Sequence, residues 1–250
     1  MCFVIAVLRR LSIAVLFLLG GCGDGKNGDA ITFGTSADYR PFEYYEGGEI
    51  VGFEVDLAKA IAEKLGKQAE FRDMSFQAVL TELQNESIDV AMASMSPTKE
   101  RRQNYDFTVV YHKSGVALVY KKGNKPDASS NLSGVKVACQ LGSVPEKWIK
   151  ENRPTAKVVS IDHVTQGGEF LKAGHVVGIV VDSPAAISLC ADNQEFEYVI
   201  IAELSDDDGG CAMAVKKDSP LKQQIDDAIQ KLQDSGELQA IKAKWNMVSA

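Results

Sequence analysis

Apolar residues along this chain form short runs that alternate with stretches of helical periodicity. Runs such as Ile31–Gly34 and Val176–Val181 are typical of buried strands, whereas Leu57, Ile61 and Leu65 recur at the spacing of one helix face. The alternation of strand and helix continues to the end of the chain. Such alternation indicates an α/β fold with mostly parallel sheets.

The pattern predicts strands at 31–34, 69–71, 88–92, 116–120, 135–139, from 158, 176–181, 198–201 and 211–215. It predicts helices at 56–65, 76–83, 145–150, 168–172, 184–189, 220–232 and 238–245. The segment Lys121-Lys122-Gly123 ends the first series of strands and helices, and a second series begins with the strand at 135–139. We therefore expect two lobes, with any ligand bound where loops converge beyond the carboxyl ends of the strands.

The N-terminal segment has the organisation of a secretory signal. Two arginines precede the apolar run Leu11–Leu19, which is too short to span a bilayer comfortably as a permanent helix. Residues 19–22 read Leu-Gly-Gly-Cys and resemble a bacterial lipobox, in which the cysteine is acylated. We expect a signal peptide at 1–21, followed at 22–30 by the lipidated Cys22 and a flexible tether. An uncleaved anchor is the alternative.

Charge and histidine spacing exclude some classes of protein. The formal net charge is −7, and it becomes −9 without segment 1–21, which holds two arginines and no acid. An acidic body argues against nucleic-acid binding and is compatible with a cationic ligand. His112, His163 and His175 are scattered without metal-ligand spacing, so we expect no metal and no cofactor.

Three cysteines follow Cys22, which leaves at least one thiol unpaired within the chain. Cys139 lies inside a predicted buried strand. We expect either a disulfide between Cys190 and Cys211, in an oxidising compartment, or three free thiols.

Several short motifs follow one another in a fixed order. They read GTSADYRPFE at 34–43, GFEVDL at 52–57, IDVAMASMSPTKER at 88–101, GS at 142–143, VVDSP at 180–184, DSGEL at 234–238 and KW at 244–245. In order and spacing, from about residue 31 to 245, they resemble the periplasmic polar-amino-acid-binding proteins of ABC transporters.

The resemblance implies the two-lobed type II periplasmic-binding-protein fold with two hinge crossovers. The first lobe would be discontinuous and comprise 31–113 and 213–250, and the second would comprise 117–209. The hinge would lie near 113–116 and 210–212. Ligand binding would close the lobes, and a membrane permease would recognise the closed form.

The resemblance also implies a ligand site whose chemistry suits a free amino acid. Arg101 offers a planar fork for the ligand's carboxylate, unless it forms a surface ion pair. Ser96 can contribute its hydroxyl and N–H, and Ser94 its hydroxyl or carbonyl, unless these serines only cap a turn.

The second lobe would supply the other half of this site. The N–H groups of Ser143 and Val144, at a helix N-terminus, would complete the carboxylate site, although the family usually has Thr in place of Val144. Asp182 would bind the ammonium group. Its alternative role is to cap the helix that begins near Pro184.

Two aromatic residues would enclose the ligand's side chain. Tyr39 and Phe76 stand where the family places such a pair, which suits a guanidinium or a flat amide, although core packing is the alternative. Ser36 replaces an Asp that lysine/arginine/ornithine binders often carry. Ala93 replaces the Ser of some basic-residue binders.

We therefore expect an extracytoplasmic, periplasmic, lipid-anchored protein that delivers a free amino acid to an ABC importer. A basic amino acid is favoured, arginine before lysine or ornithine, if Asp38, Glu43 or Asp73 neutralises its side chain. If none of these carboxylates reaches the pocket, glutamine or another polar amino acid is the better prediction.

Two other classes remain as alternatives. A cyclohexadienyl dehydratase uses the same fold, but the sequence offers no nucleophile–base pair, so we expect no catalytic residue. A receptor sensing domain is the other, and the end of the chain shortly after Trp245 weighs against it. We expect a monomer.

Overall fold

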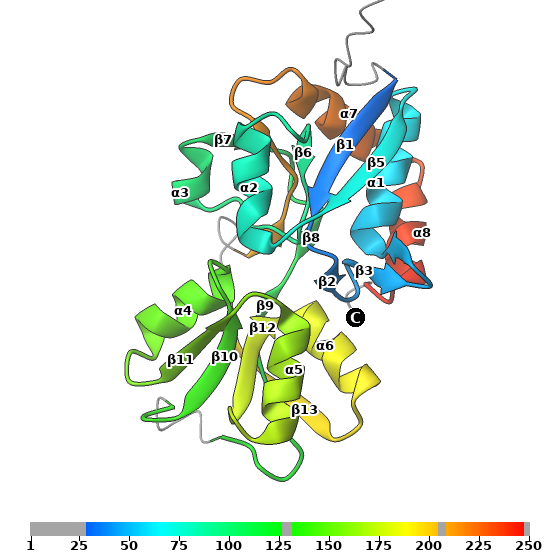
Figure 1. Ribbon diagram of the computed structural model, residues 1–250. Helices are drawn as coiled ribbons and strands as arrows, with labels where there is room; N and C mark the ends of the chain where they lie inside the picture. The colour runs from blue at the N-terminus through cyan, green and yellow to red at the C-terminus, as the bar shows by residue number, and fades with distance from the viewer. Residues whose placement is uncertain (1–28, 127–131, 205–208, 248–250) are drawn as a thin grey trace, which may run out of the picture.

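The computed structural model describes residues 29–126, 132–204 and 209–247, so the expected signal peptide and Cys22 lie outside the described residues. Each of its two lobes contains a five-stranded sheet covered by helices on both faces (Figure 1). The predicted α/β fold is confirmed. No helix in the described ranges is long and apolar enough to cross a membrane.

The sheet of the first lobe has the order β5-β1-β6-β15-β7. Its strands are β1 (Ala30–Thr35), β5 (Gln68–Asp73), β6 (Val90–Ala91), β7 (Tyr105–Phe107) and β15 (Ala214–Lys216). Helices α1 (Phe53–Lys64), α7 (Leu221–Asp234) and α8 (Glu237–Lys244) cover one face, and α2 (Phe76–Gln84) covers the other. Successive strand residues point to opposite faces of the sheet. Val90 therefore packs in the hydrophobic cluster on the α1 side (the α1 cluster), and Ala91 packs in the cluster on the α2 side (the α2 cluster).

A small antiparallel sheet precedes α1. It consists of β2 (Asp38–Tyr39), β3 (Glu43–Glu46) and β4 (Glu49–Val51). Gly52 then turns the chain into α1 with φ of 141°, and a Cβ there would lie 2.1 Å from the carbonyl oxygen of Phe42. Only glycine fits this approach. It allows α1 to begin at Phe53, three residues before the predicted start.

The sheet of the second lobe has the order β11-β10-β12-β9-β13. Its strands are β9 (Gly115–Lys121), β10 (Lys136–Gln140), β11 (Lys157–Ile161), β12 (Gly178–Asp182) and β13 (Phe196–Glu203). Helix α4 (Val144–Asn152) packs on one face, and α5 (Val164–Ala173) and α6 (Ser183–Asp192) pack on the other. In each lobe three neighbouring strands run parallel, and one strand, β15 or β9, pairs antiparallel with both of its neighbours.

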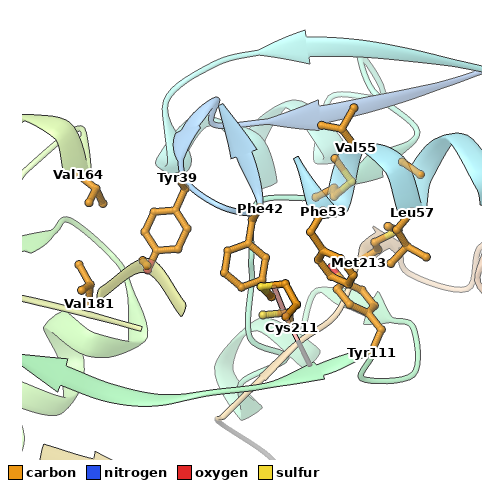
Figure 2. Packing of buried hydrophobic residues seen from close by; sticks show 14 of the residues in the cluster. Tyr39, Phe42, Phe53, Val55, Leu57, Tyr111, Val164, Val181, Cys211 and Met213 are labelled. Atoms are coloured by element: carbon orange, nitrogen blue, oxygen red, sulfur yellow. The ribbon is translucent and has the colours of Figure 1, made fainter. Parts of the chain in front are cut away.

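The chain passes between the lobes beside two short strands. Strand β8 (His112–Lys113) pairs antiparallel with β14 (Gly210–Cys211). Aromatic residues of the first lobe, including Phe42, Phe53 and Tyr111, pack against Cys211 in this region (Figure 2). The expected hinge falls on these segments and stays a prediction.

The expected disulfide between Cys190 and Cys211 is wrong. Cys139, Cys190 and Cys211 are all free thiols in the described part of the chain. Cys190 belongs to α6 of the second lobe, whereas the Sγ of Cys211 lies 3.3 Å from the Oγ of Ser94 in the first lobe.

Candidate ligand-binding site

A cavity of about 20 Å³ lies between the lobes, beyond the carboxyl ends of β6, β10 and β12. This is the position at which parallel strands of α/β folds present their loops to a ligand. The described residues that line it are Tyr39, Phe76, Ala93, Ser94, Ser96, Arg101, Gln140, Ser143, Val144, Pro145 and Asp182. Nine of the ten residues expected to contact a ligand are therefore brought together, and Ser36 is not among them.

Arg101 enters the cavity from the short helix α3 (Lys99–Arg102). Its Nη1 donates to the carbonyl oxygen of Ser96 at 2.8 Å, and its Nη2 donates across the lobes to that of Gly142 at 3.1 Å. Its guanidinium carbon lies 5.4 Å from the ring centre of Phe76. No carboxylate among the described residues forms an ion pair with it.

Burial lowers the pKa of Arg101 to about 10, although the nearby charges of Asp182 and Glu100 raise it. The side chain therefore stays protonated at neutral pH. A partly buried cation whose hydrogen-bond acceptors are neutral carbonyl groups has capacity left for an anion.

Asp182 occupies the N-cap position of α6, but its side chain does not cap that helix. Its Oδ2 accepts a hydrogen bond from the hydroxyl of Tyr39 at 2.8 Å, and its Oδ1 lies 3.5 Å from the hydroxyl of Ser114. Burial raises the pKa of Asp182 to about 6, against the opposing effects of these two hydrogen bonds and of the charge on Arg101. The carboxylate is thus turned away from the α6 amides.

Tyr39 both packs in the hydrophobic core and lines the cavity. The residue is 7% exposed and its ring stacks on Phe42 at a centroid distance of 5.9 Å (Figure 2). The ring of Phe76 packs against the α2 cluster and faces Arg101. Core packing and lining of the cavity therefore coexist in these two aromatic residues.

The backbone amides around the cavity differ in what they already bind. The N–H of Ser94 donates to the carboxylate of Glu54, and that of Ser143 donates to the carbonyl of Gln140 at 3.2 Å. The hydroxyl of Ser143 accepts from the N–H of Glu146 and so caps α4. Val144 is the first residue of α4, where an N–H has no acceptor inside the helix.

None of the three carboxylates considered for a basic ligand is among the described residues that line the cavity. Asp38 accepts from the N–H of Val164 at 2.8 Å and from the hydroxyl of Ser36 at 3.0 Å. Asp73 accepts from the N–H of Ala37 at 2.9 Å, and Glu43 is fully buried. Among the described lining residues, Asp182 supplies the carboxylate.

Sequence reasoning missed Gln140 and Pro145. Gln140 closes β10, so a polar residue at the carboxyl end of an apolar strand was the available signal. Its Nε2 donates to the carbonyl of Asp162 at 3.3 Å. No group of His, Cys, Asp and Glu side chains suited to a metal ion occurs within the described residues.

Two α/β lobes around a cavity lined by opposite charges define a two-lobed binding protein. The chain belongs to the bacterial extracellular solute-binding proteins, family 3, whose model matches residues 31–248. Its place in that family makes it an extracytoplasmic solute-binding protein of the kind that serves ABC transporters.

Named relatives and a solved structure agree with this assignment. The chain is 32% identical to the arginine-binding extracellular protein ArtP of Bacillus subtilis (strain 168), over 96% of each chain. It is 30% identical to the ABC transporter glutamine-binding protein GlnH of the same organism, over 95% of each. An ancestral arginine-binding protein bound to arginine superposes with a TM-score of 0.82 at 34% identity, covering 87% of this chain and 98% of that one. This likeness confirms the expected type II fold.

Proposed function

We propose that this protein captures a free amino acid between its lobes and delivers it to the permease of an ABC importer. The observation that carries the proposal is that Arg101 and Asp182, from opposite lobes, line one cavity. A free amino acid carries a carboxylate and an ammonium group, which these two side chains complement. The N–H of Val144 would add to the carboxylate site, and the hydroxyl of Ser96 to the ammonium site.

Binding would couple to closure of the lobes. A cavity of about 20 Å³ has room for little more than one water, so a ligand needs the lobes to separate before it can enter. Contacts that cross between the lobes, such as Asp38 to the N–H of Val164, would form again on closure. The segments near 113–116 and 210–212 would bend, and the permease would recognise the closed form.

Arginine is the ligand that we propose first. ArtP and the ancestral protein are both named for arginine binding. The cavity itself shows how a guanidinium can be held without a carboxylate, since two carbonyl groups and the ring of Phe76 hold that of Arg101. Phe76 and Gln140 would face the ligand's side chain.

Glutamine is the second candidate. The observation in its favour is that Asp38, Glu43 and Asp73 do not line the cavity. Among the described lining residues, no second acidic group is then available to neutralise a distal positive charge once Asp182 binds the ammonium group. The relative GlnH is named for glutamine binding.

A thermal-shift panel of the twenty amino acids and ornithine tests both the class and the identity of the ligand. A ligand at a hundred times its Kd stabilises the folded protein by about 2.7 kcal/mol. We expect the largest shift with arginine, and a shift with glutamine but none with arginine or lysine would favour the second candidate. Calorimetry should show that Arg101→Ala and Asp182→Ala each lose about 2–5 kcal/mol of binding free energy while remaining folded. Near-normal affinity in either folded variant contradicts the site.

We also propose that Cys22 is the lipidated N-terminus of the mature protein, since Leu-Gly-Gly-Cys follows a short apolar run. Mass spectrometry of membrane-extracted protein should find diacylated or triacylated Cys22. An unmodified Cys22, or a mature chain that begins elsewhere, contradicts the anchor.

Catalysis is not part of the proposed function. Among the residues that the structure describes, those that line the cavity include a single carboxylate and neither His, Lys nor Cys, so they offer no nucleophile–base pair. Incubation with prephenate or arogenate should therefore yield neither phenylpyruvate nor phenylalanine. Formation of either product would establish the dehydratase alternative.

A further inference from the structure

Two buried glutamates lie behind the wall of the cavity, outside the residues that line it. Glu43 on β3 and Glu54 in the first turn of α1 are both 0% exposed. Their carboxyl groups are neighbours. No backbone or side-chain donor among the described residues serves either carboxyl oxygen of Glu43. Glu54 is therefore the group toward which a proton on Glu43 can be directed.

Glu54 connects the cavity wall to the segments that pass between the lobes. Its Oε2 accepts from the N–H of Ser94 at 2.9 Å, and its Oε1 accepts from the hydroxyl of Tyr111 at 2.5 Å. Ser94 lines the cavity, and Tyr111 immediately precedes β8. The N–H of Tyr111 donates to the carbonyl of Cys211 in β14. One carboxylate thus fixes a cavity residue relative to both crossing segments.

Ser94 needs such a contact because its backbone is unusual. Its φ is 48°, in the left-handed region that residues other than glycine seldom adopt. A conformation of this kind persists where its surroundings determine it. A hydrogen bond from an N–H to a buried carboxylate is stronger than one to a neutral acceptor. Glu54 therefore holds Ser94 in the orientation that it presents to the cavity.

The surroundings of the pair favour a shared proton. The titratable groups that face it are Tyr111 beside β8, Cys211 on β14 and Asp38 on β2, and none of these is a cation. Lys242 on α8 interacts electrostatically with Cys211 and with His112. Burial and mutual repulsion raise the pKa of Glu43 well above its usual value, and burial raises that of Glu54. Two adjacent buried carboxyls then ionise one at a time.

We infer that Glu54, with Glu43 as its proton-sharing partner, is a positioning residue of the ligand cavity that sets ligand affinity through Ser94 and Tyr111. The inference rests on the proposed function, since it concerns the affinity of the same cavity. While Glu43 holds the proton, Glu54 is free to accept both hydrogen bonds. Loss of that proton at higher pH places two charges together without a donor between them and weakens the hold on Ser94.

Calorimetric titration with L-arginine and with L-glutamine tests the inference. Glu54→Ala should raise Kd by about tenfold or more, which is the expected effect of losing a charged acceptor at Ser94. Glu54→Gln should recover most of the affinity, because its amide oxygen can accept from Ser94 while its NH₂ donates to Tyr111. The matched control is Ile229→Ala, a buried residue of α7 outside the cavity, which should lower stability and leave Kd unchanged.

The pH dependence of Kd distinguishes a role of Glu43 and Glu54 in positioning Ser94 from a role in the stability of the protein alone. In Glu43→Gln the amide permanently replaces the protonated carboxyl, so affinity should match the wild type near neutral pH. Above neutral pH the wild type should lose affinity relative to Glu43→Gln, since only the wild type has a proton to lose. The ratio of the two Kd values cancels the titration of the ligand's amine.

The possible results distinguish failure of this inference from failure of the proposed function. If Glu54→Ala binds like the wild type, or if the two pH profiles coincide, the inference is wrong and the proposed function stands. If Glu54→Ala does not fold, Glu54→Gln and Tyr111→Phe still decide, because pH profiles identical to that of the wild type in both contradict it. If the wild type binds neither ligand nor any amino acid of the panel, the proposed function fails and the inference with it.

Discussion

The hydroxyl of Tyr39 lies 2.8 Å from Oδ2 of Asp182, although the two residues belong to different lobes and are 143 positions apart. This hydrogen bond can form only when the lobes are together, so it contributes to the closed state that holds a ligand. It also supplies a donor to a carboxylate that would otherwise be buried with few partners. The contact therefore couples the ammonium side of the proposed site to lobe closure.

Tyr39→Phe should weaken ligand binding by about tenfold to a hundredfold, because a hydrogen bond to a charged group contributes about 1.5–3 kcal/mol. Its ring packing against Phe42 is kept, so the fold should persist. Calorimetry gives the affinity. Tyr105→Phe is the matched control, since its hydroxyl donates to the carbonyl of Leu80 within the first lobe. That variant should lose stability and keep its affinity, and equal losses of affinity in both would contradict a specific role of Tyr39.

Ligand affinity should fall as the pH decreases through about 6, the value to which burial raises the pKa of Asp182. Protonation removes the negative charge that would pair with the ligand's ammonium group, whereas above this pH the carboxylate is available. In Asp182→Asn the affinity should be low and nearly independent of pH between about 5 and 7. Calorimetric Kd values across that range test this, and a wild-type profile that is flat there would remove Asp182 from the site.

Arg101→Lys should raise Kd by at least about tenfold, because an ammonium group cannot reproduce the two-directional fork of a guanidinium. The present side chain donates to Ser96 and Gly142 at once, one contact in each lobe. The neighbouring Arg102 provides the control, since its Nε donates to the carbonyl of Pro97 but the residue does not line the cavity. Arg102→Lys should bind normally. Equal effects of the two substitutions would show that the loss comes from α3 and not from the site.

Much of the fold follows from periodicity, but its boundaries depend on contacts that periodicity does not contain. The predicted strand at 211–215 is two strands, because Cys211 pairs with β8 and Ala214 pairs with β6 in another sheet. Between them the N–H of Ala212 donates to the carbonyl of Met95. An apolar run indicates extended structure, whereas the change of partner is decided by tertiary packing.

In the candidate site, too, the sequence predicts where residues lie but not the contacts that they make. Residues that follow strand ends, such as Ser96, Ser143 and Asp182, could be located because parallel strands converge at one edge. The burial of each acidic side chain could not be predicted from strand order. Glu54 precedes the predicted helix at 56–65, yet α1 begins at Phe53 and this side chain is fully buried.

Glu43→Gln should stabilise the protein at neutral pH and flatten the dependence of its stability on pH. The pKa of Glu43 is raised well above the usual 4.5, so in the range between these values the folded state binds a proton that the unfolded state has released. The free energy of unfolding of the wild type should therefore decrease as the pH rises from about 4.5 toward the raised pKa. Glutamine has no proton to release, so the variant avoids this decrease.

Urea denaturation between about pH 4 and pH 8 measures the effect. The variant should exceed the wild type by an amount that grows with pH and vanishes near pH 4, where Glu43 is protonated in both states. Glu63→Gln is the control, because it makes the same substitution at an exposed position of α1. Its difference from the wild type should be small and change little with pH. A Glu43→Gln difference that stays constant with pH would mean that Glu43 holds no extra proton in the folded protein. The proton-sharing pair beside Ser94 would then have to be abandoned.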